Sequence, residues 1–276
     1  MTTVAQSPTV GGLLRDWRQR RRMSQMDLSL EATVSTRHLS FVETGRAKPS
    51  RELVLHLAEH LEVPLRERNA LLLAAGYSPS FPQSPLDAGT MAPVRAALDA
   101  ILAGHAPFPA VVVDRRWDLV TANQPALALM TAGVDPTLLE PPVNVLRVSL
   151  HPDGLAPRIV NLQEYSAHLL DRLRRQAAAG GDPALTALHG ELAAYPGVRD
   201  DGGAPAHVAD LLFVPLVLRS DGGELTFFST IATFGTALDV TIAELAVESF
   251  FPADDATSTA LHDRAATAQP ASASPS

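Results

Sequence analysis

Residues 24–46 read SQMDLSLEATVSTRHLSFVETGR, and this stretch decides the fold of the N-terminal part of the chain. Two short runs with helical spacing of apolar residues flank a tight turn, and a serine, Ser24 or Ser35, precedes each run. Serine is a favoured N-cap because its hydroxyl accepts a hydrogen bond from a backbone N–H of the first helical turn. Gly45 follows the second run, as a C-terminal cap does. The stretch predicts two short helices joined by a turn, the arrangement that places a second helix in the DNA major groove.

The flanking residues extend this pair into an all-helical domain over residues 11–77. The spacing of apolar residues predicts further helices at about 12–22, 51–61 and 65–75. Pro64 and Gly76 stand just after the last two of these runs and would end the helices there. Residues 1–10, which precede the domain, are expected to be flexible.

A second domain is predicted at 91–252, after a proline-rich linker at 78–90. It begins with a helix at 91–103 and a β-hairpin at 109–123, where two β-branched runs flank a polar turn. Helices follow at about 124–132, 144–150, 161–179 and 183–194, and strands at 211–218, 224–234 and 239–250. This order predicts an α+β fold, an antiparallel sheet with helices collected on one side. Residues 253–276 are rich in Ala, Ser, Thr and Pro, and we expect them to be disordered.

Composition restricts the function classes. The chain has 276 residues, enough for two domains, and no cysteine, so disulfides and thiolate metal sites are excluded. No apolar run approaches the ~18 residues of a membrane-spanning helix, and residues 1–8 lack the features of a signal peptide. We therefore expect a cytoplasmic protein with no membrane partner. The net charge of −8 is uneven, at +3 for residues 1–78 and −11 for the rest, as expected when only one domain meets phosphate.

The second helix of the opening stretch has two faces. Leu39 and Val42 fall on the side that would pack inward, which leaves the other side for the groove. Arginine pairs bidentately with guanine, and Phe or Thr can contact a thymine methyl group. The candidate base contacts are Thr36, Arg37, Ser40 and Phe41. The candidate phosphate contacts, which fix register without reading sequence, are Gln25, Ser35, Arg46, Lys48 and Ser50. The alternative is a helical bundle whose arginines are merely solvated. It is disfavoured because the helix caps, the basic face and the charge asymmetry all indicate DNA binding.

Residues 11–77 resemble the lambda-repressor-type helix-turn-helix of the XRE family. The likeness is carried by Ser24-Gln25 and by the ends Glu43-Thr44-Gly45-Arg46 and Lys48-Pro49-Ser50. In that family an arginine of the first helix commonly pairs with the glutamate before the Gly-Arg, which implies a partly buried ion pair between Arg18 and Glu43. Thr33 departs from the pattern, because the family often carries glycine in the turn. A β-branched residue is poor at positive φ, so either the turn avoids that conformation or its backbone is strained.

The resemblance continues through the second domain. Four segments carry it, namely residues 66–77 (RERNALLLAAGY), 117–123 (WDLVTAN), 144–147 (NVLR) and 151–154 (HPDG). Together, over about residues 11–252, they resemble the MmyB-type transcription regulators. That resemblance implies a PAS-like C-terminal ligand-binding domain and a hydrophobic, fatty-acid-like ligand. We expect no other cofactor and no metal.

Such a ligand would need an apolar cavity with a few polar anchors. The candidate lining residues are Leu212, Val214, Phe227, Ile231 and Phe234, and the candidate anchors for a carboxylate are Arg147 with Asn144 and His151. The alternative is that the strand residues are ordinary core and that Arg147 caps a helix or pairs with an acid.

Three function classes can be compared. An enzyme is disfavoured because the nine histidines are scattered and neither a Gly-x-Ser-x-Gly elbow nor a phosphate loop is present. A helix-turn-helix repressor regulated only by protein–protein contacts would need no pocket. We expect a transcription regulator that binds double-stranded operator DNA as a homodimer, since a single small module makes few base contacts, and that senses a small hydrophobic ligand.

Overall fold

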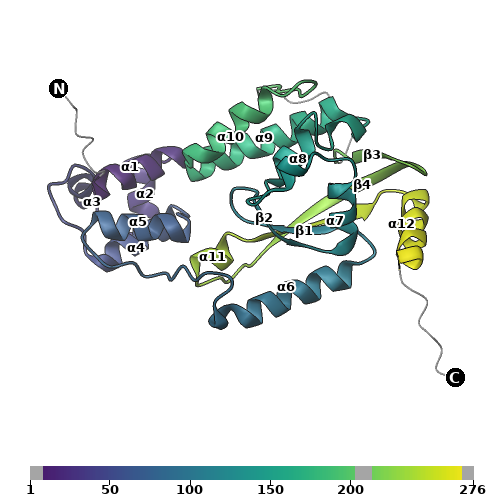
Figure 1. Ribbon diagram of the computed structural model, residues 1–276. Coiled ribbons are helices and arrows are strands. Elements are labelled where there is room, and N and C mark those ends of the chain that lie inside the picture. The colour runs from purple at the N-terminus through teal and green to yellow at the C-terminus, as the bar shows by residue number, and fades with distance from the viewer. Residues whose placement is uncertain (1–8, 203–212, 269–276) are drawn as a thin grey trace. The chain divides into compact units, whose positions relative to one another are not determined.

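The computed structural model describes residues 9–202 and 213–268, which form two compact units (Figure 1). The first unit consists of Met1–Pro85 together with Gly235–Ala243. The second consists of Leu86–Phe234 together with Glu244–Ser276. The first boundary between them falls inside the predicted linker at 78–90.

The first unit is built from short helices, and serine residues cap the starts of three of them. Its N-terminal helices are α1 (Val10–Arg20), α2 (Gln25–Glu31), α3 (Thr36–Glu43), α4 (Arg51–His60) and α5 (Leu65–Ala74). The hydroxyls of Ser24, Ser35 and Ser50 each accept a hydrogen bond from the backbone N–H three residues on. At Ser24 the Asp27 carboxylate bonds back to the Ser24 N–H and completes a capping box. The core includes Leu14, Trp17, Leu28, Leu39, Val54, Leu57 and Leu72. The predicted helix-turn-helix domain is confirmed.

The turn between α2 and α3 is strained at Thr33. Its φ is +53°, in the left-handed region, and the Val34 N–H donates to Ser29 O at 2.9 Å to close the turn. This conformation costs an L-residue roughly 1–2 kcal/mol. Of the two outcomes that the sequence leaves open, the strained turn is the one present.

A segment from late in the sequence completes the first unit. Gly235–Ala243 contains the short helix α11 (Val240–Ala243). The Val240 N–H donates to Pro82 O at 2.8 Å, and the Ser84 N–H donates to Asp239 Oδ2 at 3.1 Å. The predicted strand at 239–250 is therefore wrong in its first residues, because Asp239 accepts from the Thr241 N–H and starts a helical turn.

The second unit is built on a five-stranded antiparallel sheet. Its strands are β1 (Ala110–Val113), β2 (Leu119–Ala122), β3 (Leu216–Ser220), β4 (Gly223–Thr233) and β5 (Ala246–Pro252). They lie in the order β2-β1-β5-β4-β3. The predicted hairpin at 109–123 is the β1–β2 pair, in which Val111 lies opposite Ala122. This sheet with its helices is a PAS-like α+β domain, and the predicted fold class is confirmed.

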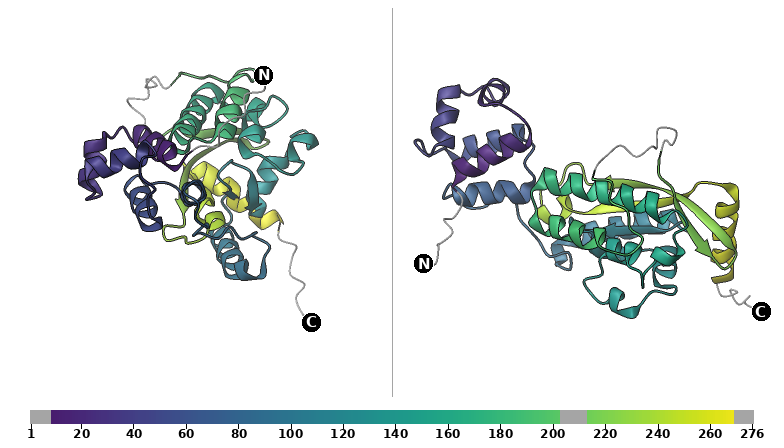
Figure 2. Two further views of the ribbon diagram at one scale, coloured as in Figure 1. Left: turned by 90° about the vertical axis from the view of Figure 1, so that its left-hand side faces the viewer. Right: turned by 90° about the horizontal axis from the view of Figure 1, so that it is seen from above.

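Helices cover both faces of the sheet, not one face as the sequence predicts (Figure 1). Val111 and Val113 face one way and belong to a core with α7 (Gln124–Thr131), α8 (Val145–Leu150), α9 (Leu162–Gly180) and α10 (Pro183–Ala193). Their strand neighbour Val112 faces the other way, because successive side chains alternate, and packs with Leu98 and Leu102 of α6 (Ala92–His105). The helices α9 and α10 run side by side (Figure 2). Single 3-10 turns lie at η1 (Gly89–Met91), η2 (Pro136–Leu139) and η3 (Ala156–Arg158).

The predicted disordered tail at 253–276 is wrong up to Ala268. Asp255–Ala268 forms α12, and residues 269–276 lie outside the described residues. The Asp254 carboxylate caps the helix by accepting from the Thr257 N–H, and Thr257 Oγ1 accepts from the Thr226 N–H. Leu261 is buried against Leu225 and Phe227 of β4. A composition rich in Ala and Thr predicts disorder, and it does not reveal the few specific contacts that hold this helix.

Two properties of residues 9–202 and 213–268 bear on partners. In this part of the chain no helix combines the length and the apolar character needed to cross a membrane. The same residues contain no group of three or more His, Asp or Glu side chains placed to hold a metal ion.

Thr33→Gly should stabilise the first unit, because glycine adopts positive φ without the steric cost of a β-branched side chain. We expect a gain of about 0.5–1 kcal/mol after the entropic cost of glycine, seen as a Tm higher by a few degrees in thermal unfolding. Thr44→Gly is the matched control, because Thr44 has an ordinary φ of −91°, and it should lower Tm. A fall in Tm for both variants would contradict the assignment of strain to the turn.

Candidate DNA-binding face and ligand cavity

Helix α3 has one buried and one accessible face, as the sequence predicts. Leu39 and Val42 are buried in the core of the first unit. Arg37 is exposed, and its guanidinium carbon lies 5.3 Å from the centroid of the Phe41 ring. This cation–π contact restrains a long side chain on the accessible face. A restrained arginine loses less conformational entropy when it binds a base edge.

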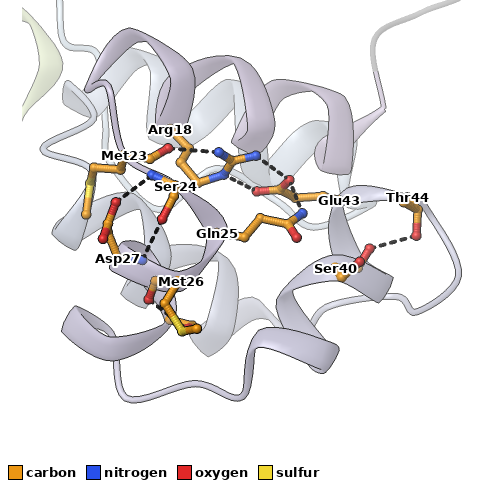
Figure 3. Close-up of polar contacts among 10 residues, drawn as sticks. Arg18, Met23, Ser24, Gln25, Met26, Asp27, Ser40, Glu43 and Thr44 are labelled. Carbon is orange, nitrogen blue, oxygen red and sulfur yellow. Dashed lines mark hydrogen bonds and ion pairs between the residues drawn. The ribbon is translucent and has the colours of Figure 1, made fainter.

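The other two predicted base contacts differ in how free they are. Thr36 Oγ1 lies 2.8 Å from Ser29 Oγ, so its hydroxyl already joins α3 to α2. Ser40 offers its carbonyl oxygen to Thr44 Oγ1 at 2.7 Å (Figure 3), which does not use the Ser40 hydroxyl. On this geometry Arg37, Ser40 and Phe41 form the accessible part of the predicted set.

Four of the five predicted phosphate contacts lie at exposed positions around α3 and α4. Ser35 and Ser50 are the N-caps of these helices, and their hydroxyl hydrogens remain available while the oxygens accept from the backbone. Arg46 and Lys48 are exposed in the segment between the two helices. Helix N-termini and cations are the groups that bind phosphate oxygens.

The predicted ion pair between Arg18 and Glu43 is present and buried (Figure 3). Arg18 Nε donates to Glu43 Oε1 at 2.7 Å and Nη2 donates to Oε2 at 2.8 Å. The Arg18 Nη1 group donates to Met23 O at 2.8 Å. Gln25 Nε2 donates to Glu43 Oε2 at 2.8 Å, which leaves only its second amide hydrogen for the predicted phosphate contact. The pair thus joins α1, the start of α2 and the end of α3.

The close approach of α1 to α3 depends on a glycine. A Cβ atom at Gly11 would lie 2.3 Å from Val42 O, a distance that real Cβ atoms do not adopt. Gly11 therefore allows α1 to bring Arg18 within bidentate reach of Glu43.

The Glu43 carboxyl stays ionised in the fold. Burial alone raises its pKa, but the hydrogen bonds from Arg18 and Gln25 and the positive charge of Arg18 lower it below its ordinary value of 4.5. The hydrogen bond to Glu43 outweighs burial at Arg18 and raises the pKa of that guanidinium. Two parallel hydrogen bonds between a charged guanidinium and a charged carboxylate are the strong, bidentate form of this pair.

The second unit contains a mostly apolar cavity between the sheet and the helices α7, α8 and α9. Its volume is about 70 Å³. The apolar lining includes Val111, Ala126, Leu129, Met130, Leu146, Leu155, Leu169, Leu218, Phe227 and Phe250. Typical ligand pockets measure roughly 300–1,000 Å³, so a ligand of that size would bind only if lining side chains moved.

Arg172 on α9 and Glu248 on β5 form a polar end of this cavity. Arg172 Nη1 lies 3.3 Å from Glu248 Oε1, and the guanidinium carbon lies 4.2 Å from the centroid of the Trp117 ring. Ser229 Oγ donates to the same Glu248 oxygen at 3.0 Å. Arg172 Nη2 is buried and has no hydrogen-bond partner among the described residues. Such an unpaired donor costs roughly 1–3 kcal/mol, and a ligand oxygen beside it would remove that cost.

Two titratable groups beside this pair are uncharged at neutral pH. Burial raises the pKa of the Tyr165 phenol, which also lines the cavity, above its ordinary value of 10.0, and the charge of Glu248 raises it further. Burial lowers the pKa of His168 below its ordinary value of 6.5, and the charges of Arg172 and Arg175 lower it further. Among the residues that line the cavity, Arg172 and Glu248 are the charged ones, one positive and one negative.

The three predicted polar anchors do not line the cavity. Arg147 donates to Glu191 through Nε at 2.7 Å and Nη2 at 2.8 Å, and is half exposed. Asn144 is buried and donates to Arg116 O at 2.8 Å while capping α8. His151 lies against the Tyr195 ring. The structure does not bring these three side chains to the cavity, because Arg147 pairs with Glu191, Asn144 bonds to backbone groups and His151 packs on Tyr195.

Of the predicted apolar lining, Phe227 alone is among the cavity residues of the described chain. Val214 packs at the edge of the main core, Ile231 is 43% exposed, and Phe234 packs on the α6 side of the sheet. Leu212 lies outside the described residues. A shift of one residue along a strand moves a side chain to the other face of the sheet, and hydropathy alone does not fix that position.

Sequence reasoning missed Arg172 and Glu248, although one signal was available. Glu248 lies two residues from both Ala246 and Phe250 in an apolar strand, so the three side chains face the same side of the sheet. A charged residue at such an inward position requires a partner. Arg172 carries no comparable signal, because arginines recur along α9.

Comparison with known proteins adds family relationships to this geometry. Residues 94–263, more than half of the chain, match the MmyB-like transcription regulator ligand binding domain, and residues 9–71 match a helix-turn-helix domain. The crystal structure of the clp gene regulator ClgR from Corynebacterium glutamicum is 23% identical and covers 37% of this chain and 94% of its own, with a TM-score of 0.22. The structure of an RNA-binding light-oxygen-voltage receptor is 12% identical and covers 94% of this chain and 63% of its own, with a TM-score of 0.27. No curated protein matches the chain.

Arg18→Ala should destabilise the first unit by about 3–5 kcal/mol, because it leaves a buried carboxylate without its partner. Arg15→Ala is the control, because Arg15 is exposed, and it should have a much smaller effect in urea unfolding followed by circular dichroism. Equal effects of the two variants would count against the pair.

The same pair predicts an acid-sensitive part of the stability. Because folding lowers the pKa of Glu43, its contribution is present above the unfolded pKa, near 4.5, and is lost as pH falls through the lower folded pKa. Glu43→Gln should therefore be less stable than the wild type at neutral pH, and the difference should shrink as pH falls below about 4.5. A difference that stays constant over this range would show that the charge of Glu43 is not what stabilises the unit.

Proposed function

Because this chain belongs to the family of MmyB-like transcription regulators, we propose that it binds specific operator DNA as a homodimer and senses a small hydrophobic, fatty-acid-like ligand. The helix-turn-helix is the output and the PAS-like domain is the sensor. The observation that carries the sensing part is the apolar cavity with the unpaired buried donor of Arg172. In the cell such a regulator acts in the cytoplasm, where the operator is.

The accessible face of α3 supports the proposed base contacts. Arg37, stacked on Phe41, offers the planar donor pair that matches guanine O6 and N7. The Phe41 ring is half-buried beside it and would contact a thymine methyl group. The hydroxyl of Ser40, which the contact of its carbonyl oxygen with Thr44 does not use, can bond to either type of base edge.

The remaining contacts would fix register on the duplex. Arg46 and Lys48 follow α3 in the sequence, and Ser50 caps α4. Charged side chains of this kind release counterions when they bind phosphate, so they make affinity salt-dependent without reading sequence. Since a single helix reads only a few bases, we propose that two chains occupy two half-sites of a palindromic operator.

The cavity supports a ligand with an acyl chain. Its walls are leucine, valine and phenylalanine side chains together with Met130, a flexible residue that can adapt to a ligand. Because the present volume is about 70 Å³, ligand binding must enlarge it. Enlargement moves α7, α8 or α9 relative to the sheet, and such a change is what a sensor domain needs in order to signal. A regulator controlled by protein contacts alone would gain nothing from the buried donor of Arg172.

One arginine variant and one lysine variant should separate base recognition from phosphate binding. Arg37→Ala should weaken binding to the selected operator by about 1–3 kcal/mol and relax base preference at one position of each half-site, with little change for random duplex. Lys48→Ala should weaken binding to all duplexes alike and reduce the slope of log affinity against log salt by about one per subunit. Fluorescence anisotropy over a salt series measures both quantities. Loss of base preference in Lys48→Ala with none in Arg37→Ala would reverse the assignment.

Native mass spectrometry of the purified full chain tests the ligand. We expect a dimer that carries, or takes up when offered, one acyl compound per chain. Ala126→Leu fills the cavity and should abolish this uptake, whereas Ala100→Leu at an exposed position of α6 should leave it unchanged. Equal uptake by both variants would remove the cavity as the site, and a dimer that takes up no acyl compound would favour regulation through protein contacts.

A further inference from the structure

We propose that α7 is the movable wall of the cavity, that the acyl ligand enters and leaves by displacing the C-terminal end of this helix, and that Arg158 holds that end in place. This inference rests on the proposed function, because it concerns how the ligand reaches the same cavity.

Helix α7 is the least buried of the three helices that line the cavity. It contributes Ala126, Leu129 and Met130 to the lining, yet of its eight residues, all within the described chain, Ala126 alone is buried. In the same part of the chain four of the six residues of α8 and six residues of α9 are buried. The cost of displacing a helix grows with the apolar area that it exposes to water. Because the cavity measures only about 70 Å³, a wall must move to admit a ligand, and α7 is the wall that moves at the least cost.

The N-terminal end of α7 is fixed by a buried asparagine. Asn123 Oδ1 accepts hydrogen bonds from the Ala110 N–H of β1 at 3.0 Å and from the Ala126 N–H of α7 at 3.1 Å. The Asn123 Nδ2 group donates to Phe108 O at 2.8 Å. Asn123 is only 9% exposed, so breaking these bonds would leave buried polar groups without partners. A displacement of α7 must therefore occur at its other end.

A glycine follows the C-terminal end of α7. Gly133 has a φ of +70°, a conformation that glycine adopts without steric cost, and a Cβ atom placed there would meet none of the described residues within 4 Å. The chain returns to the core at Val134, which is buried. The backbone therefore has a permissive position between the end of α7 and its next fixed point.

Arg158, a side chain from outside the helix, holds this end. Arg158 Nη1 donates to Ala132 O at 2.8 Å and to Leu129 O at 3.3 Å. Arg158 Nε donates to Arg219 O at 3.3 Å, on the edge strand β3. The last carbonyls of a helix lack partners within it. The guanidinium of Arg158 therefore joins free carbonyls of α7 to the edge of the sheet.

The contacts of Arg158 are of a kind that breaks reversibly. Its three acceptors are uncharged carbonyl oxygens, and the side chain is half-buried, so water can replace the acceptors when α7 moves. Burial lowers the pKa of the guanidinium below its ordinary value, while the charge of Asp221 raises it and that of Arg264 lowers it. Arg264 is thus a neighbour by charge, and its own guanidinium bonds to Ser220.

Hydrogen exchange of the ligand-free full chain tests whether Arg158 holds α7. Arg158→Ala should raise the exchange rates of peptides that cover residues 124–133 by about 10-fold, because opening no longer breaks the bonds to α7. Peptides from α8 and α9 should exchange as in the wild type, which shows that the variant is folded. Arg264→Ala removes an exposed neighbouring arginine of α12, and as the matched control it should leave residues 124–133 unchanged. Equal exchange of these residues in Arg158→Ala and the wild type would overturn the inference.

Uptake kinetics test whether this motion admits the ligand. The probe is cis-parinaric acid, an acyl compound whose fluorescence rises in apolar surroundings, mixed with the full chain by stopped flow. Because opening precedes binding, the observed rate should reach a plateau, equal to the opening rate, as the probe concentration rises. Arg158→Ala should raise this plateau by about 10-fold, and Arg264→Ala should leave it unchanged.

The outcomes separate this inference from the proposed function. Uptake of the probe with no plateau in the wild type, or with the same plateau in Arg158→Ala, would overturn the movable-wall inference and leave acyl sensing intact. A wild-type chain that binds neither cis-parinaric acid nor any other acyl compound would overturn acyl sensing, and ligand entry past α7 with it. In that case the exchange measurement still decides whether Arg158 holds α7.

Discussion

A guanidinium held inside a fold needs a carboxylate to neutralise it and acceptors for its N–H groups, and each unit of this chain contains one such group, buried in Arg18 and half-buried in Arg172. In the first unit Arg18 is satisfied by both oxygens of Glu43 and by Met23 O. That pair is structural, because it fixes α3 relative to α1 and α2 and gives each of the three Arg18 side-chain nitrogens an acceptor. In the second unit Arg172 has its carboxylate, Glu248, but Nη2 is left without an acceptor among the described residues. Retaining an unsatisfied donor in a largely apolar cavity costs stability, and a ligand that satisfies it accounts for the cost.

The two units have separate tasks, and the chain connects them more than once. The family relationship gives a DNA-binding output and a ligand-binding input. Besides the linker near Pro85, the segment Gly235–Ala243 belongs to the first unit, although the strands on either side of it, β4 and β5, belong to the second. Those two strands carry Ser229 and Glu248, which bound the polar end of the cavity. A change in the spacing of these strands on ligand binding would therefore reach the first unit through the backbone itself.

Local rules predicted most of the first unit and less of the second. The serine caps and Gly45 follow from short-range patterns, because a cap bonds within three residues. The Arg18–Glu43 pair, 25 residues apart, was instead implied by the family resemblance. The β1–β2 hairpin and the helices α7 to α10 follow from periodicity in the same way. Helix α12 was missed because its stability depends on Leu261 and Thr257 contacting β4, which no local pattern reveals. The cavity was misassigned for a related reason. Arg147 and Arg172 are alike in sequence, and only the fold shows that Glu191 satisfies the first while the second retains a free donor.

The central claim is that occupation of the cavity changes the affinity of the helix-turn-helix for DNA. It is tested most directly by titrating the full chain with an operator selected from random duplexes, in the presence and absence of a saturating acyl compound that the chain takes up, at one salt concentration. Coupling between sites is typically about 1–3 kcal/mol, so the account predicts that the operator Kd changes by about 5-fold to 150-fold in one direction, and that the change disappears in Ala126→Leu. Identical Kd values with and without the bound acyl compound would contradict it.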